Sequence, residues 1–128
     1  MEEQKSPLKE LIWVGSSKRD YMGFLGAVQD DMGFALYLAQ QGKEHPSAKA
    51  LKGFGGRGVL ELVESHEGNA YRAVYTVRFE GAVYVLHAFQ KKSKRGIATP
   101  QLEIAAVKRR LNDAEMIHQA RTAGTGGR

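Results

Sequence analysis

Four side chains with the chemistry of a phosphate-handling site fall on alternating positions of two neighbouring predicted β-strands. They are Arg72 on the first strand and His87, Phe89 and Lys91 on the second. An arginine can form two hydrogen bonds with a phosphate and stabilise additional negative charge on it. A phenylalanine can stack on an unpaired base, and a lysine or histidine can transfer a proton to or from an oxygen. These residue types together suit the binding and cleavage of RNA.

The two strands lie in the stretch from Tyr71 to Gly96, which is predicted to form a β-hairpin. The strands are expected over residues 70–79 and 82–90, with a tight turn at Glu80-Gly81. Pairing outward from this turn puts Arg72 across from Phe89. The other predicted pairs are Ala73 with Ala88, Tyr75 with Leu86, and Val77 with Tyr84. The face formed by these six apolar residues should meet the helices, and the face that holds Arg72 should be exposed.

The positive charge of the protein is concentrated in the same stretch. Residues 71–96 contain six basic residues and one acidic residue, and this net +5 equals the formal charge of the whole 128-residue chain. A localised positive field attracts polyanions such as nucleic acid. Three of the six basic residues follow the strand end; they are Lys92, Lys94 and Arg95. Lys52 and Arg57 add positive charge in a glycine-rich loop at residues 43–58.

Each of these residues also has an ordinary structural explanation. Arg72 can pair with Glu61 on the preceding strand, because the two share a face if that hairpin turns at residues 66–69. His87 and Phe89 can be packing residues, and lysines at a strand end can discourage edge pairing. Taken singly, the ordinary explanations are preferred. Taken as a set on one face, a polyanion site is the better account.

Composition restricts the class of protein. The size predicts one domain over residues 1–120, followed by a disordered glycine-rich tail at residues 121–128. The chain has no cysteine, which excludes disulfides, thiolate zinc sites and cysteine nucleophiles. No cluster of Asp and Glu accompanies the basic stretch, and we expect no metal and no cofactor. No apolar run approaches the roughly 20 residues of a membrane span, so a cytoplasmic protein with no membrane partner is expected.

The pattern of strands and helices predicts an α+β protein. The expected elements are a strand over residues 9–14, helices over 18–25 and 27–41, strands over 59–65, 70–79 and 82–90, and a helix over 100–119. In this β-α-α-β-β-β-α order, the three sequential strands form an antiparallel meander. The first strand then returns to one edge of the small antiparallel sheet, and the helices pack on one face.

The helix expected over residues 27–41 has a single apolar stripe. The stripe consists of Val28, Met32, Ala35, Leu36 and Ala39. Phe34, Tyr37 and Leu38 lie off the stripe. These three residues either pack on the first helix or form a surface for a partner, and packing is the preferred interpretation.

The last helix is predicted to begin with Thr99 as N-cap and Pro100 in its first turn. Ile104, Val107, Leu111 and Ala114 give it a narrow apolar stripe. The basic residues 108–110 are expected to form a solvated face.

Three segments of the chain resemble the RelE/ParE toxin superfamily, and more narrowly its HigB-like, phage-derived branch. They read KALKGFGGRGVLELVE, AYRAVYTVRF and VYVLHAFQKKSKRGIATPQLEIAAVKRRL, and they lie between Lys49 and Leu111. One departure is Gly26, where this branch is expected to have a proline that opens the second helix.

The resemblance implies a RelE-like fold and the toxin of a type II toxin–antitoxin system. The implied activity is that of a ribosome-dependent mRNA endoribonuclease that needs no metal. In such an enzyme, the ribose 2′-hydroxyl attacks the adjacent phosphate and leaves a 2′,3′-cyclic phosphate and a 5′-hydroxyl. The implied partners are the ribosome, mRNA and a HigA-like helix-turn-helix antitoxin, with operator DNA bound only through the antitoxin.

The resemblance also implies roles for particular residues. Arg72 matches the strand arginine that contacts the scissile phosphate, and Lys91 and Lys92 match the basic end of the last strand. His87 matches loosely a position of catalytic polar residues, and Phe89 is expected to be the platform for a base. The predicted contacts with ribosomal RNA are Lys52, Arg57, Lys94 and Arg95. RelE itself uses a C-terminal tyrosine, whereas this chain has none after Tyr84, so the general base stays open.

Two other functions are compatible with the sequence. One is a ParE-like inhibitor of gyrase, which binds protein and cuts no RNA. The other is an inactive phage-derived remnant that only binds a helix-turn-helix antitoxin. The basic hairpin favours the endoribonuclease, because a ribosomal partner explains its charge more directly.

Overall fold

A computed structural model of the chain describes residues 8–55, 58–92 and 99–126. Five strands and three helices lie in these ranges. In chain order they are β1 (Glu10–Trp13), α1 (Ser17–Met22), α2 (Gly26–Gln40), β2 (Lys49–Ala50), β3 (Val59–His66), β4 (Asn69–Thr76), β5 (Ala82–Lys92) and α3 (Gln101–Gly126). The α+β class and the predicted order are therefore confirmed, with the two-residue strand β2 as an addition. No helix in the described ranges is long and apolar enough to cross a bilayer.

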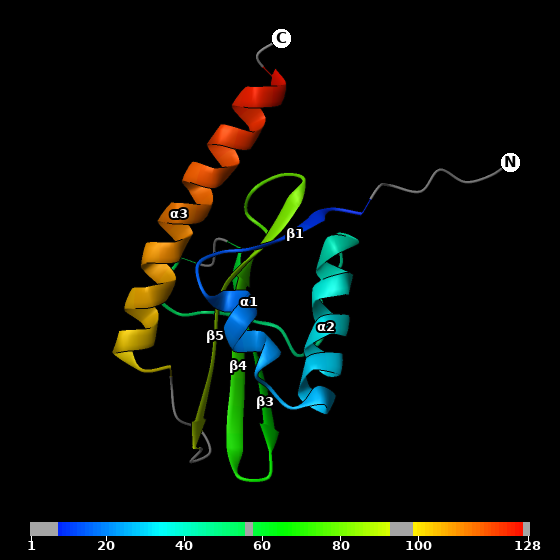
Figure 1. Cartoon of the computed structure of the whole chain (residues 1–128), viewed down its shortest axis with the longest axis vertical. Coiled ribbons are helices and arrows are strands. Elements are labelled where there is room, and N and C mark those ends of the chain that lie inside the picture. Colours follow the sequence, from blue (N-terminus) through cyan, green and yellow to red (C-terminus); the bar gives the residue numbers. More distant parts are fainter. Residues whose placement is uncertain (1–7, 56–57, 93–98, 127–128) are drawn as a thin grey trace, which may run out of the picture.

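The strands form one mixed sheet in the order β1-β5-β4-β3-β2. The strands β3, β4 and β5 form the predicted antiparallel meander. The first strand returns to the β5 edge as expected, but it runs parallel to β5 and pairs only with residues 82–85. The sheet is therefore not purely antiparallel. Figure 1 shows β1 crossing the upper part of the sheet between α2 and α3.

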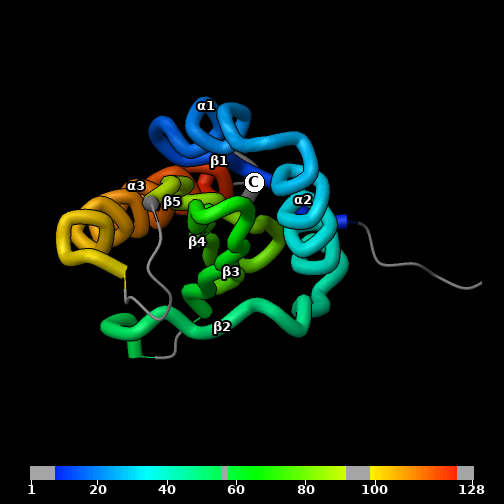
Figure 2. Tube along the Cα trace, turned by 90° about the horizontal axis from the view of Figure 1, so that it is seen from below, coloured from blue at the N-terminus to red at the C-terminus, as the bar shows by residue number. Residues whose placement is uncertain are grey.

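The helices cover both faces of the sheet, whereas one face was expected. On one face, the predicted α2 stripe packs with Tyr71, Ala73 and Tyr75 of β4. On the other face, Val107, Leu111 and Ala114 of α3 pack with Val74, Tyr84 and Leu86. Figure 2 shows α2 and α3 on opposite sides of the strands and α1 beside β5. The physical reason is that both sides of the β4–β5 pair are apolar, so each side needs a helix to cover it.

A β-bulge at Leu86 changes the predicted hairpin register. Arg72 pairs with Phe89 and Ala73 with Ala88, as predicted. Beyond the bulge, Tyr75 pairs with Val85 and Thr76 with Tyr84, one residue away from the predicted pairs. The extra residue places Tyr84 and Leu86 on the α3 side of the sheet, opposite to their predicted face.

The β4–β5 connection is also longer than the predicted turn at Glu80-Gly81, because β4 ends at Thr76. The Thr76 hydroxyl donates to the Gly58 carbonyl and accepts a hydrogen bond from the Arg78 amide. The Val77 amide also donates to Gly58. These bonds turn the chain away from β5 before the predicted turn is reached.

The preferred interpretation of the off-stripe residues of α2 is wrong for two of them. Every predicted stripe residue is buried, but 54% of Phe34 and 43% of Tyr37 are exposed. Neither ring is therefore covered by α1.

The last helix is longer than predicted. It runs to Gly126, so residues 121–126 are helical and not a disordered tail. An ion pair between Arg121 of α3 and Glu10 of β1 accompanies this extension. Helix propagation from a packed segment costs less than a new nucleus, which explains how a weak helix-forming sequence continues.

The β3–β4 turn provides a test of the backbone geometry. Glu67 and Gly68 both have positive φ, 50° and 84°, as a type I′ hairpin turn requires. We expect Gly68→Ala to lower the free energy of unfolding by about 1 kcal/mol, because alanine is strained at this φ. Gly26→Ala is the matched control, since this helical glycine has open space around its Cβ position. Thermal melts should show a loss of stability for Gly68→Ala alone, and equal melting temperatures would contradict the turn geometry.

Candidate nucleic-acid interface

The β4–β5 pairing brings the predicted set of side chains together. Arg72 lies directly across from Phe89, and the ring of His87 stacks on Phe89 with centroids 5.1 Å apart. Lys91 follows two residues later on the same strand face and is exposed. One arginine, one stacked pair of rings and one lysine therefore share a face, as the sequence predicted.

Arg72 is fixed from two directions and is not on an open face. Its side chain is only 11% exposed, and its Nη1 lies 3.3 Å from Glu61 Oε2. The same nitrogen donates to the Thr99 hydroxyl at 3.1 Å, and Thr99 donates to Glu61 at 2.7 Å. The ion pair with Glu61 was the ordinary explanation for Arg72, and it is confirmed. The prediction of an exposed face is wrong here, because Thr99 and Glu61 contact the guanidinium of Arg72.

His87 has both ring nitrogens in hydrogen bonds. Nε2 lies 2.6 Å from Glu103 Oε1, and Nδ1 lies 3.0 Å from Arg110 Nη1. A guanidinium only donates, so Nδ1 must accept and Nε2 must carry the proton that goes to Glu103. This arrangement holds His87 as the neutral tautomer with a defined ring orientation. The histidine side chain is 10% exposed, so the expectation of an open histidine is also wrong.

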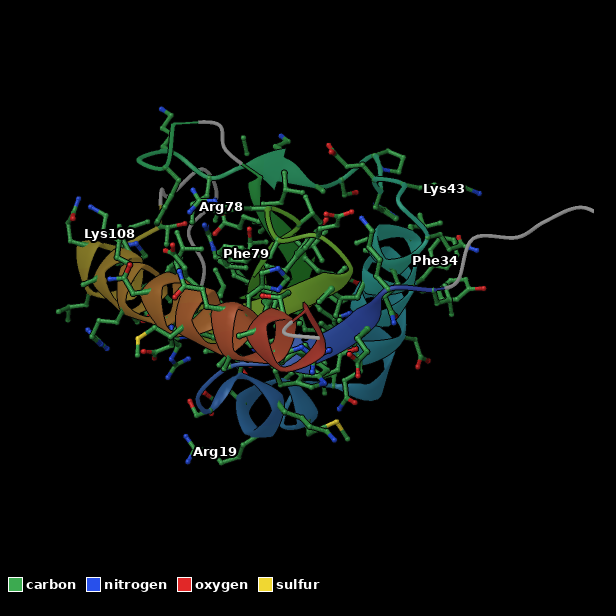
Figure 3. The ribbon with its side chains drawn as sticks, turned by 90° about the horizontal axis from the view of Figure 1, so that it is seen from above. Arg19, Phe34, Lys43, Arg78, Phe79 and Lys108 are labelled. Carbon is green, nitrogen blue, oxygen red and sulfur yellow. The ribbon has the colours of Figure 1, made fainter. Side chains whose placement is uncertain are left out.

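Arg110 ties α3 to β5 and to the start of α1. Besides His87, it donates through Nη1 to the Leu86 carbonyl at 3.1 Å and through Nη2 to the Ser16 hydroxyl at 3.0 Å. The sequence predicted a solvated face for residues 108–110. That prediction is wrong for Arg110, whereas Lys108 and Arg109 are exposed. Figure 3 shows Lys108 on the outer side of α3.

The network continues to a carboxylate in α1. The Ser16 hydroxyl donates to Asp20 Oδ2 at 2.8 Å. Burial alone would raise the pKa of Asp20. Hydrogen bonds from Ser16 and Arg19 and the charges of Arg19 and Arg110 outweigh burial and lower this pKa. Asp20 is therefore an ionised acceptor beside the histidine.

A hollow of about 340 Å³ lies next to this network, beside the part of β5 that extends past β1. It is lined by Asp20, Gly23 and Phe24 from the α1 end and by residues 87–90 of β5. The hollow borders the His87–Phe89 stack. The geometry thus offers one aromatic pair, one carboxylate and the lysine-bearing strand end at a single edge of the sheet.

The other predicted contacts are placed only in part. Lys92 ends β5. Lys52 is exposed, and its neighbours Leu51 and Phe54 pack in the cluster that contains the α3 stripe. The remaining predicted RNA contacts lie outside the described residues. They are Arg57, Lys94 and Arg95.

Five residues of the site were not predicted from the sequence. They are Ser16, Asp20, Thr99, Glu103 and Arg110. Glu103 and Arg110 are seven residues apart, with Val107 between them in the apolar stripe of α3. Charged residues at this spacing lie on the same helix face as the stripe. The spacing could therefore have predicted that Glu103 and Arg110 face the sheet.

Residues 22–112 match the family model described as "Phage derived protein Gp49-like (DUF891)". The chain belongs to this Gp49-like family. The matched region includes every site residue named above except Ser16 and Asp20. No curated protein sequence matches the chain.

Two solved structures are similar to this Gp49-like chain. One is the Escherichia coli toxin RelE, in an arginine-substituted mutant in the free state. It has a TM-score of 0.53 and 19% identity, over 80% of this chain and 98% of RelE. The fold is therefore RelE-like. The other is the RelBE2 toxin–antitoxin complex of Mycobacterium tuberculosis, with a TM-score of 0.45 and 14% identity, over 71% of this chain and 100% of the matched chain.

The role of Arg110 as an anchor gives a stability test. We expect Arg110→Met to lower the free energy of unfolding by about 2 kcal/mol, because it removes charge-assisted hydrogen bonds to partly buried groups. The matched control, Arg109→Met, changes an exposed neighbour and should stay within about 0.5 kcal/mol. Urea denaturation measures both. Nitrogen NMR should also show that His87 loses its single tautomer only in Arg110→Met, and equal behaviour of the two variants would contradict the network.

Proposed function

We propose that this protein is the toxin of a type II toxin–antitoxin system and acts as a ribosome-dependent mRNA endoribonuclease. The observation that carries the proposal is the position of Arg72 across from Phe89, with Lys91 on the same strand face. Membership of the Gp49-like family and the RelE-like fold support it. Its place of action is the cytoplasm, where translated mRNA is found.

The reaction is attack of a ribose 2′-hydroxyl on its adjacent phosphate, with no metal. Arg72 stabilises the extra negative charge on the phosphate, and its fixed partners Glu61 and Thr99 keep the guanidinium in one orientation. Phe89 stacks on a base next to the scissile bond. Preorganisation of this kind avoids rearrangement when the charge develops.

Proton transfer falls to the lysines at the end of β5. His87 already uses both ring nitrogens, so it acts as an acid or base only after one of these bonds breaks. Lys91 is exposed at the strand end and makes a better candidate, together with Lys92. Lys52, Arg57, Lys94 and Arg95 are then contacts with ribosomal RNA.

The expected neutralising partner is a HigA-like helix-turn-helix antitoxin, and operator DNA is bound only through it. A gene for such a protein beside this one would support the system. A ParE-like gyrase inhibitor would instead cause DNA cleavage complexes and cut no RNA. An inactive remnant would cause neither effect.

The Arg72–Glu61 ion pair allows a test in which both variants lose the same contact. Arg72→Gln should reduce mRNA cleavage about 100- to 1,000-fold, because it removes a charge that stabilises the transition state. Glu61→Gln breaks the same pair and leaves the arginine, so cleavage should stay within several-fold of the unmodified protein. Primer extension on mRNA in a purified translation system measures both rates.

Urea denaturation of the two variants is the control, since both are expected to lose similar stability. An equal loss of cleavage in both would assign Arg72 a structural role only. Absence of cleavage by the unmodified protein, with DNA cleavage complexes on induction, would favour the gyrase inhibitor.

A further inference from the structure

A second hollow lies on the α2 side of the sheet. It has a volume of about 190 Å³, several times the roughly 30 Å³ that one water occupies. Met32 and Leu62 are buried beneath it, and Asp31, Phe34 and Glu64 are at its rim. We call it the α2–β3 hollow. It has room for one long side chain.

Two large apolar side chains of α2 are exposed at or near the hollow. Phe34 lines it and is 54% exposed, and Tyr37 on the same helix is 43% exposed. The Phe34 ring lies nearly perpendicular to the ring of His45, with centroids 6.0 Å apart. Figure 3 shows Phe34 on the outer side of α2, across the molecule from Lys108. Apolar groups gathered beside a hollow mark a contact surface.

The hollow is lined by two acidic residues and by no lysine or arginine, in a chain of net charge +5. The two acidic residues are Asp31 and Glu64. Asp31 and Glu64 share a hydrogen bond across the hollow. Burial, the hydrogen bond with Asp31 and the negative charge of Asp31 together raise the pKa of Glu64 to about 7. A cation placed next to two neighbouring carboxyl groups favours their charged forms, so this pair suits a basic side chain from a partner.

The outer edge of β3 beside the hollow is also open. The strand β2 pairs only with Leu60 and Glu61. Within the described ranges, no strand pairs with that edge over residues 62–66. An open edge offers backbone donors and acceptors to an incoming polypeptide.

We propose that the α2–β3 hollow is where the antitoxin docks. The docking segment places one lysine or arginine between Asp31 and Glu64 and one apolar side chain against Phe34. This inference rests on the proposed toxin–antitoxin function. A polypeptide fits better than RNA because the two carboxyl groups repel phosphate and the exposed groups are apolar. The hollow lies on the opposite face of the sheet from Arg72, so docking and RNA cleavage can be changed separately.

The test measures binding of the helix-turn-helix protein encoded beside this gene, by titration calorimetry with the full chain. The double variant Asp31→Asn/Glu64→Gln and the variant Phe34→Ala should each weaken binding at least tenfold. The matched controls are Asp113→Asn/Glu115→Gln and Met116→Ala, which change exposed acidic and apolar residues of α3. Both controls should stay within twofold. Thermal melts establish that all four variants fold.

The outcomes separate this inference from the proposed activity, because mRNA cleavage is measured on the same variants. Loss of binding with unchanged cleavage supports both. If the neighbouring protein binds tightly, the hollow variants weaken this binding, and no mRNA is cleaved, the docking inference is supported and the nuclease activity is contradicted. Binding that the hollow variants do not weaken, or no binding of the neighbouring protein at all, overturns docking. A dimer in light scattering that Phe34→Ala dissolves would assign the surface to a second copy of the chain and also overturn it.

Discussion

In β5, Val85 pairs with Tyr75 and His87 pairs with Val74, which leaves Leu86 as an extra residue between two pairs. This bulge lets one strand serve two purposes. Before the bulge, β5 pairs with β1 as well as β4, and the side chain of Tyr84 packs under α3. After it, β5 continues past β1 and presents His87 and Phe89 beside a hollow. The Leu86 carbonyl accepts a hydrogen bond from Arg110, so the bulge is also the point where α3 is fastened to the sheet.

The contacts between α3 and the sheet hold the side chains of the site in defined positions. Glu103 and Arg110 hold His87 from its two nitrogens, and Thr99 joins Arg72 to Glu61 just before the helix begins. Arg72, which contacts the phosphate in our account, is thus positioned by residues on two other segments. Side chains held in this way lose little conformational entropy when a phosphate binds, which favours binding in one defined geometry. Asp31, Glu64 and the exposed Phe34 lie on the other face of the sheet, at the α2–β3 hollow, so we expect the two faces to suit different partners.

The sequence alone predicted the features that depend on the spacing of residues within one helix or strand. The α2 stripe follows from the helical period of 3.6 and was predicted correctly. The pairing of Arg72 with Phe89 was also predicted correctly, but the pairs nearer the turn differ by one residue and the bulge restores the predicted register. The bulge was not predictable, because an extra residue in a strand depends on what packs against it. Arg110 was misassigned because a charged residue beside an apolar stripe suits both water and a buried acceptor. Phe34 was wrongly predicted to pack on the first helix, because an apolar residue type alone does not show whether the side chain packs within its own chain.

The central claim is that this protein cleaves mRNA through the 2′-hydroxyl next to the scissile phosphate. The most direct measurement uses ribosomes programmed with an mRNA that has a single 2′-deoxynucleotide at the mapped cleavage position. Our account predicts that the natural mRNA gives a 2′,3′-cyclic phosphate and a 5′-hydroxyl, and that the deoxy-substituted mRNA stays intact at this position. Cleavage of the deoxy-substituted mRNA at the same bond, or products with a 5′-phosphate, would contradict the account.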